Sequence, residues 1–149
     1  MHALVCLLIL AGLAAQEEGE TYPLNLTCPG ESQLVLSKII NTADETIAEL
    51  YFLSANDYRE TIGIGVYPPG HEKAFYISPA KRRPQQKYAL LRVEGIPVRP
   101  GGAKLDVGGQ VVFRLVFEKV PLKKFHLMEG TAKMTDTAAW HFPNVSLEE

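Results

Sequence analysis

One stretch of the chain, residues 109–130, constrains the fold more than any other. It reads GQVVFRLVFEKVPLKKFHLMEG, and its first half carries apolar side chains at every second position. Successive side chains of a β-strand point to opposite faces, so a period of two predicts a strand with one strongly apolar face. We expect the buried face to hold Phe113, Leu115 and Phe117, with Arg114 exposed on the other face.

A second alternation follows in the same stretch. Pro121 has no backbone N–H to donate, so the first strand is expected to end or bend there. Beyond it, Phe125 and Leu127 share one face of a second expected strand, which spans residues 125–129. The opposite face at this point of the chain holds Lys124, His126 and Met128.

The rest of the chain consists of short apolar or alternating segments separated by turn residues, and none of them has a convincing helical period. Several short strands with turn signals at close intervals are typical of antiparallel β-sandwiches. We therefore predict an all-β fold, a single antiparallel β-sandwich of immunoglobulin-like architecture. Its other strands are expected at 21–27, 33–40, 46–53, 62–67, 72–78, 87–93, 103–107 and 140–147.

The first fifteen residues, MHALVCLLILAGLAA, form an apolar run that ends in small residues and precedes the acidic stretch QEEGE. This order is typical of a secretory signal peptide, and the run is too short to cross a bilayer as a helix. We expect residues 1–15 to be a signal peptide and residues 16–149 to be the β-sandwich domain, without a membrane span. The mature chain would then be periplasmic, cell-surface or secreted. The alternative is a buried N-terminal helix.

Charge and cysteine content narrow the classes of partner. The chain has 15 Lys and Arg against 17 Asp and Glu, a net charge of −2, which provides no electrostatic case for nucleic acid or a membrane surface. Removal of the first fifteen residues leaves Cys28 as the only thiol, so the domain cannot form an internal disulfide. We expect Cys28 to be buried as a small apolar side chain rather than paired with another chain.

Three segments of the second half resemble a known group of proteins. The segments KYALLRVEGIPV, GGQVVFRLVFEKVPLKKFHLMEG and WHFPNVSLEE are similar to a family of uncharacterised bacterial domains that follow signal peptides. Those domains end in an aromatic-rich strand, a proline-containing bend, an F-x-L-x-E-G element and a short closing strand. The resemblance implies an extracytoplasmic β-sandwich. It does not point to any particular activity, because the family is uncharacterised. The matching residues are Tyr88, Gly95, Ile96, Pro97, Phe113, Phe117, Pro121, Phe125, Leu127, Glu129, Gly130 and Trp140.

Four residues near the C-terminus form the candidate metal site: His126, Met128, Met134 and His141. Imidazole and thioether groups together suit copper, especially Cu(I). The pattern loosely resembles the His-x-Met element of periplasmic copper chaperones but lacks their further, regularly spaced Met and His residues. The alternative is that these side chains lie on the surface, on the polar face of the sheet.

Glu129, before Gly130, is the one candidate for general acid–base catalysis, which also needs a partner group and a pocket. No second carboxylate stands at a telling spacing, so the alternative is a strand-end residue before a glycine in the left-handed conformation. The motifs G-x-S-x-G and H-E-x-x-H and the P-loop are absent from the sequence. We therefore predict that the protein is not an enzyme.

Two further features have surface interpretations. Lys81, Arg82, Arg83 and Lys87 lie in an expected hairpin loop, which either meets an anionic surface or is a solvated loop that discourages edge pairing. The tripeptides that begin at Asn25 and Asn144 are N-glycosylation sequons, which a bacterial source would make coincidental.

Together these features favour an exported, non-enzymatic binding or structural module. Such a module would meet an unknown protein or cell-envelope partner through a face or an edge of its sheet. The alternative is a periplasmic copper-binding protein.

Overall fold

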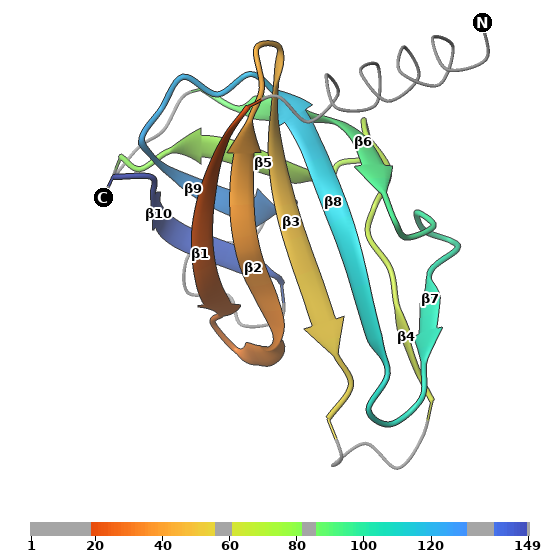
Figure 1. Cartoon of the computed structure of the whole chain (residues 1–149). Coiled ribbons are helices and arrows are strands. Elements are labelled where there is room, and N and C mark those ends of the chain that lie inside the picture. Colours follow the sequence, from red (N-terminus) through yellow and green to blue (C-terminus); the bar gives the residue numbers. More distant parts are fainter. Residues whose placement is uncertain (1–18, 56–60, 82–85, 131–138, 149) are drawn as a thin grey trace, which may run out of the picture.

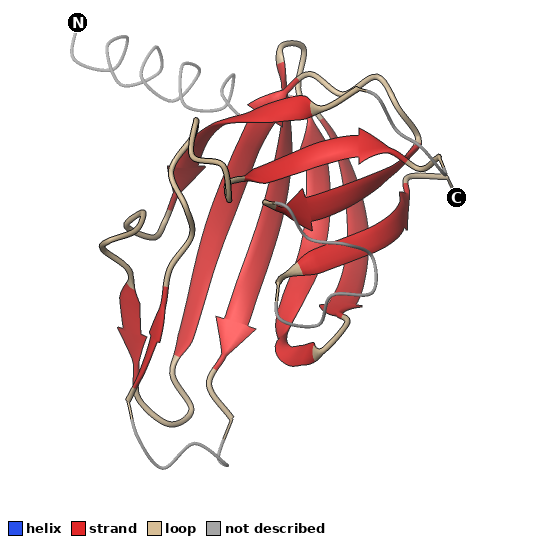
Figure 2. Cartoon of the chain, turned by 180° about the vertical axis from the view of Figure 1, so that it is seen from behind, coloured by secondary structure: helices blue, strands red, loops and turns tan. Residues whose placement is uncertain are grey.

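The structure is a computed structural model that describes residues 19–55, 61–81, 86–130 and 139–148. These residues form ten β-strands and no helix (Figure 2). No helix within these ranges is long and apolar enough to cross a membrane. The expected boundary between residues 15 and 16 lies outside the described residues. The strands are β1 (Glu20–Cys28), β2 (Glu31–Asn41), β3 (Glu45–Leu53), β4 (Ile62–Ile64), β5 (Phe75–Pro79), β6 (Tyr88–Glu94), β7 (Ala103–Leu105), β8 (Gln110–Glu118), β9 (Lys124–Glu129) and β10 (His141–Ser146).

Eight of the strands form one sheet in the order β1-β2-β3-β8-β6-β5-β9-β10, and every neighbouring pair is antiparallel. Strands β1, β2, β3 and β8 run side by side, while β5, β9 and β10 lie behind them and cross them at an angle (Figure 1). Strand β6 joins the two layers, since it pairs with β8 through residues 90–94 and with β5 through residues 88–89. The predicted all-β antiparallel sandwich is therefore confirmed. Strands β4 and β7 form a separate two-stranded ribbon.

The core lies between the two layers and follows the predicted alternation of β8. Phe113, Leu115 and Phe117 are at most 1% exposed. On the other face, Arg114 is partly exposed and Val112 is 50% exposed. Phe125 and Leu127 of β9 enter the same core from the opposite layer. The two alternations of residues 109–130 thus supply both halves of one core, although β8 and β9 are not neighbours in the sheet.

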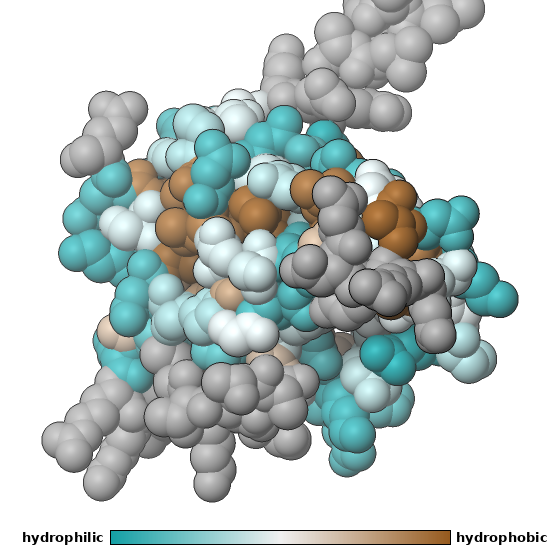
Figure 3. Space-filling view, turned by 90° about the horizontal axis from the view of Figure 1, so that it is seen from below, coloured by the Kyte–Doolittle hydropathy of each residue, from teal (hydrophilic) through white to brown (hydrophobic). Residues whose placement is uncertain are grey.

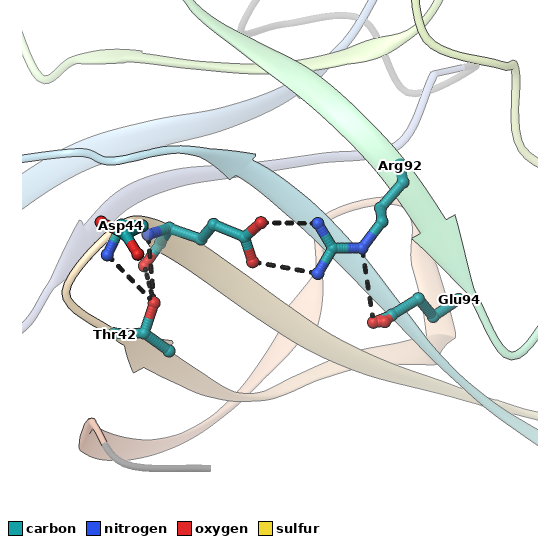
Figure 4. Close-up of polar contacts among 5 residues, drawn as sticks. Thr42, Asp44, Arg92 and Glu94 are labelled. Atoms are coloured by element: carbon teal, nitrogen blue, oxygen red, sulfur yellow. Dashed lines mark hydrogen bonds and ion pairs between the residues drawn. The ribbon is translucent and has the colours of Figure 1, made fainter. Parts of the chain in front are cut away.

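The outer face of β3, β8 and β6 carries paired charges. Arg92 contacts both carboxylate oxygens of Glu45, at 2.6 and 2.9 Å, and its Nε lies 3.8 Å from Glu94 (Figure 4). Arg114 pairs with Glu49 at 3.0 Å on the same face. The Arg92 guanidinium holds the pKa of Glu45 below its ordinary value. Exposed pairs of this kind add little stability, typically under about 1 kcal/mol.

The two outermost strands, β1 and β10, are both irregular. Each contains a proline, Pro23 or Pro143, and a β-bulge that shifts its register against the single strand with which it pairs. Proline and bulges disrupt the row of hydrogen-bonding groups that an unpaired strand edge presents. Both edges of the sheet are thereby protected against regular edge-to-edge association.

Candidate functional site

The two edge strands face each other along one side of the sandwich, and we call this line the seam. One end of the seam is closed. There the thiol of Cys28, at the end of β1, lies 3.5 Å from the carbonyl oxygen of His141, at the start of β10. Cys28 is 2% exposed and Phe142, next to His141, is 1% exposed. The expected burial of Cys28 is therefore confirmed, and at this end the core is sealed without a strand-to-strand ladder.

The other end of the seam is open and contains a groove of about 810 Å³. Residues 20–24 of β1 line one side, residues 146–148 at the end of β10 line the other, and Lys123 lies between them. We call this feature the seam groove. Its volume lies within the range of about 300–1,000 Å³ that is usual for ligand sites.

The apolar side chains of β1 are less buried than those of the adjacent strand β2. Tyr22 and Leu26 lie opposite Ile39 and Leu36 of β2, and both β2 residues are 0% exposed. Tyr22, Leu24 and Leu26 pack against the same core but remain partly exposed. Residues on the same face of adjacent strands differ in burial because β1 has a neighbour on one side only.

Polar groups span the seam groove at its mouth. The Nζ of Lys123 donates a hydrogen bond of 3.0 Å to the hydroxyl of Tyr22 and lies 5.1 Å from the centre of the Tyr22 ring. The Tyr22 hydroxyl in turn donates to the carboxylate of Glu20. The neighbouring Leu147 N–H donates to the carbonyl of Lys123 at 2.8 Å, which holds the end of β10 against the β8–β9 connection. The groove therefore offers apolar contacts flanked by charges of both signs.

Strand register brings two of the predicted metal ligands together. His141 lies directly opposite Met128 across β9 and β10, and His126 is two residues along the same strand face as Met128. Met134 lies outside the described residues. His126, Met128 and His141 are 8%, 4% and 2% exposed. The interpretation of these three as surface residues is wrong, because both faces of β9 are covered.

Hydrogen bonds limit what the two histidines can bind. The Nδ1 of His126 accepts the Asn144 N–H at 3.0 Å, so the proton of the neutral ring is on Nε2. Burial lowers the pKa of His126 and favours that neutral form. The Nδ1 of His141 lies 3.1 Å from the carbonyl oxygen of Ala139 and donates to it, which leaves Nε2 free to bind a metal. Met128 and His141 thus fit a copper ligand set, and His126 does so only if it loses its Nε2 proton.

Glu129 is the most perturbed acid in the described part of the chain. It lies at the end of β9 opposite Phe75, and its backbone N–H donates to the carbonyl of Trp140 at 3.0 Å. Burial raises its carboxyl pKa to about 7, against the opposing effects of Arg99, the Trp140 backbone and Lys73. The residue that follows has a φ of 59°, so the expected left-handed glycine is confirmed.

No catalytic partner for Glu129 emerges from the groups that surround it. Arg99 and Lys73 lie over the Tyr67 ring, 4.9 and 5.8 Å from its centre, and neither makes an ion pair with Glu129 within 4 Å. Burial raises the pKa of the Cys28 thiol, and the negative charge of Glu129 raises it further. The thiol is therefore protonated. The described groups that act on the Glu129 carboxyl are thus two cations and a backbone contact, and the nearby thiol is protonated.

The seam groove is the site that sequence reasoning missed. The signal that pointed to it was present, because the first and last expected strands each contain a proline and an asparagine, residues typical of edges and bulges.

The predicted hairpin between β5 and β6 is confirmed, although residues 82–85 of its basic loop lie outside the described residues. The surface seen from below is mostly polar, with hydrophobic side chains visible between polar ones (Figure 3).

Comparisons of the chain with protein-family models, with curated proteins and with solved structures found no match.

Proposed function

We propose that the protein is an exported, non-enzymatic binding module that holds a short extended segment of a partner protein in the seam groove. The observation that carries the proposal is the groove of about 810 Å³ between the edge of β1 and the end of β10, where Tyr22 and Leu24 remain partly exposed although they pack on the core. The partner is a protein, either soluble or part of the cell envelope.

The occupant is a peptide segment because the edge of β1 lines one side of the groove along residues 20–24. Pro23 and the bulge at Asn25 interrupt regular pairing along the whole of β1, but the stretch 20–24 still presents unpaired backbone groups at residues other than Pro23. A second extended backbone complements such groups better than a sugar or lipid does. A strand rises about 3.3 Å per residue, so the stretch 20–24 accommodates about four or five partner residues. Apolar side chains at alternate positions of that segment would contact Tyr22 and Leu24, while Lys123, Glu20 and Glu148 select its charged neighbours.

Selection of dodecapeptides from a phage-displayed library on the purified domain tests the proposal. We expect enriched peptides with alternating apolar residues, whose affinity falls at least about tenfold in a Leu24→Arg variant. The matched control is Val112→Arg, which places the same new charge on the outer face of β8, at a residue that is 50% exposed. Equal binding to both variants and to the unmodified domain would contradict the proposal.

Export is the second part of the proposal, and it rests on the N-terminal sequence alone. The apolar run and the small residues up to Ala15 support cleavage near that point. Mass spectrometry of the protein from its native compartment should find a mature N-terminus at Ala15 or Gln16. A soluble cytoplasmic chain that retains Met1 would refute it.

Copper binding is a second candidate function, favoured by one observation. His141, with a free Nε2, lies directly opposite Met128. Bound Cu(I) would use the soft thioether together with the imidazole, and the burial of both side chains means that β10 must move for the metal to enter.

Titration of the reduced protein with Cu(I) against a chelator tests this candidate. We expect the unmodified protein to bind one equivalent of Cu(I). The Met128→Ala and His141→Ala variants should lose this binding, while His126→Ala should retain it. Circular dichroism checks that each variant is folded. No competition with the chelator would remove copper from consideration.

A further inference from the structure

Asn25 and Asn144 share a rare backbone conformation. Their φ angles are 52° and 53°, and they are the only non-glycine residues with positive φ in the described part of the chain. Each occupies a β-bulge, Asn25 in β1 and Asn144 in β10. These are the two outermost strands of the eight-stranded sheet, so the same feature occurs once on each edge.

Each asparagine also begins an N-x-S/T tripeptide, Asn25-Leu26-Thr27 and Asn144-Val145-Ser146. This tripeptide is the acceptor sequence for N-linked glycosylation, and a bulky glycan requires an accessible asparagine. Both asparagines are exposed, whereas the middle residues turn inward: Leu26 packs against the core and Val145 is 0% exposed. The strands therefore direct the asparagine side chains toward solvent.

The need for a left-handed residue explains the asparagines but not the residues that follow them. Asparagine tolerates positive φ better than most other residues, so a bulge alone accounts for Asn25 and Asn144. The hydroxyl of Thr27 is exposed and has no hydrogen-bond partner among the described residues. The hydroxyl of Ser146 accepts one weak hydrogen bond, from Glu148 N–H at 3.4 Å. Among the described residues, neither hydroxyl takes part in a strong hydrogen bond that would explain its position two residues after an exposed asparagine.

We propose that Asn25 and Asn144 are N-glycan acceptor sites, one on each unpaired edge of the sheet, in cells whose export route holds an oligosaccharyltransferase. The Nδ2 of each side chain attacks the anomeric carbon of a lipid-pyrophosphate-linked oligosaccharide. An N–C bond forms, the C–O bond to the pyrophosphate breaks, the lipid pyrophosphate leaves with that electron pair, and one amide proton is released.

Glycans at these positions would obstruct edge-to-edge pairing of two copies, which adds to the effect of the prolines and bulges. They would flank the seam groove without filling it, because Asn25 points outward while Leu24 packs inward. The inference does not depend on peptide binding.

Secretion of the full chain from cultured human cells, with intact mass measured before and after peptide-N-glycosidase treatment, tests the proposal. We expect two glycans, each removed with conversion of its asparagine to aspartate. Thr27→Ala should lose one glycan and Ser146→Ala the other, although both keep the left-handed asparagine. Thr27→Ser should retain both glycans, and Asn25→Gly, which keeps the backbone conformation, should lose one.

A folded, secreted chain with the mass of the bare polypeptide would overturn the proposal. A glycan at one position alone would overturn it for the other. Far-ultraviolet circular dichroism of the secreted protein establishes that the modified chain has the β-rich fold.

Discussion

The two ends of the seam are built from the same pair of strands but differ in what covers the core. At the closed end the Cys28 thiol contacts the His141 carbonyl, and these residues are almost completely buried. At the open end Tyr22 is only partly buried, and its hydroxyl accepts a hydrogen bond from the exposed side chain of Lys123. One closed end of the seam therefore suffices to complete the core, and the other end is available for a partner.

Truncation of a side chain at each end gives the largest expected contrast. Phe142→Ala removes a residue that is 1% exposed and should lower the free energy of unfolding by about 3–5 kcal/mol. Leu24→Ala, at the half-exposed open end, should cost less than about 1.5 kcal/mol, because part of that side chain is already in water. Urea unfolding followed by circular dichroism measures both. Similar losses at the two positions would show that the seam is closed along its whole length.

A pH dependence is expected at the closed end, where Glu129 has a pKa of about 7 instead of 4.5. Between these values the unfolded chain releases the proton and the folded chain keeps it, so stability falls as pH rises through this window. In Glu129→Gln the loss of unfolding free energy between pH 4 and pH 8 should be smaller by about 1–3 kcal/mol. A carboxyl titration of Glu129 by NMR with a midpoint near 4.5 would contradict this expectation.

Strands β8 and β9 show how far the sequence could predict the fold. The alternation of β8 correctly assigns Phe113 to the core and Arg114 to the outer face. The same reasoning places Phe125 in the core but says nothing about a cover over the opposite face of β9, where His126 is buried. Alternation reports which face is apolar, and a buried polar face has no signal in a single strand.

The prolines and asparagines of the first and last expected strands mark them as candidate edges, but the position of the seam groove could not be predicted, because it depends on how these two edges meet. Residues 20–24 and 146–148 are more than 100 positions apart and meet only through the order of all eight strands. The bulge at Asn25 adds a second obstacle, since it alters the register of β1 without interrupting the alternation of exposure along that strand. For the metal candidates, the spacing of His126 and Met128 was visible in the sequence, whereas the hydrogen bond that occupies the His126 Nδ1 was not.

The smallest effect is expected far from the seam, on the outer face of β8. Arg114→Ala removes a partly exposed ion pair with Glu49 and should change the free energy of unfolding by less than about 0.5 kcal/mol. The neighbouring Phe113→Ala should cost about 3–5 kcal/mol in the same assay. Equal costs at these adjacent positions would invalidate the assignment of the two faces of β8.

Chemical-shift mapping of a selected peptide on the ¹⁵N-labelled domain tests the central claim most directly. We predict that the largest backbone amide changes fall at Thr21, Leu24 and Leu147, beside the seam groove, with no change at Val112 on the outer face. Changes centred on Val112 and its neighbours in β3 and β8, with the amides of Thr21, Tyr22 and Leu24 unmoved, would contradict this prediction.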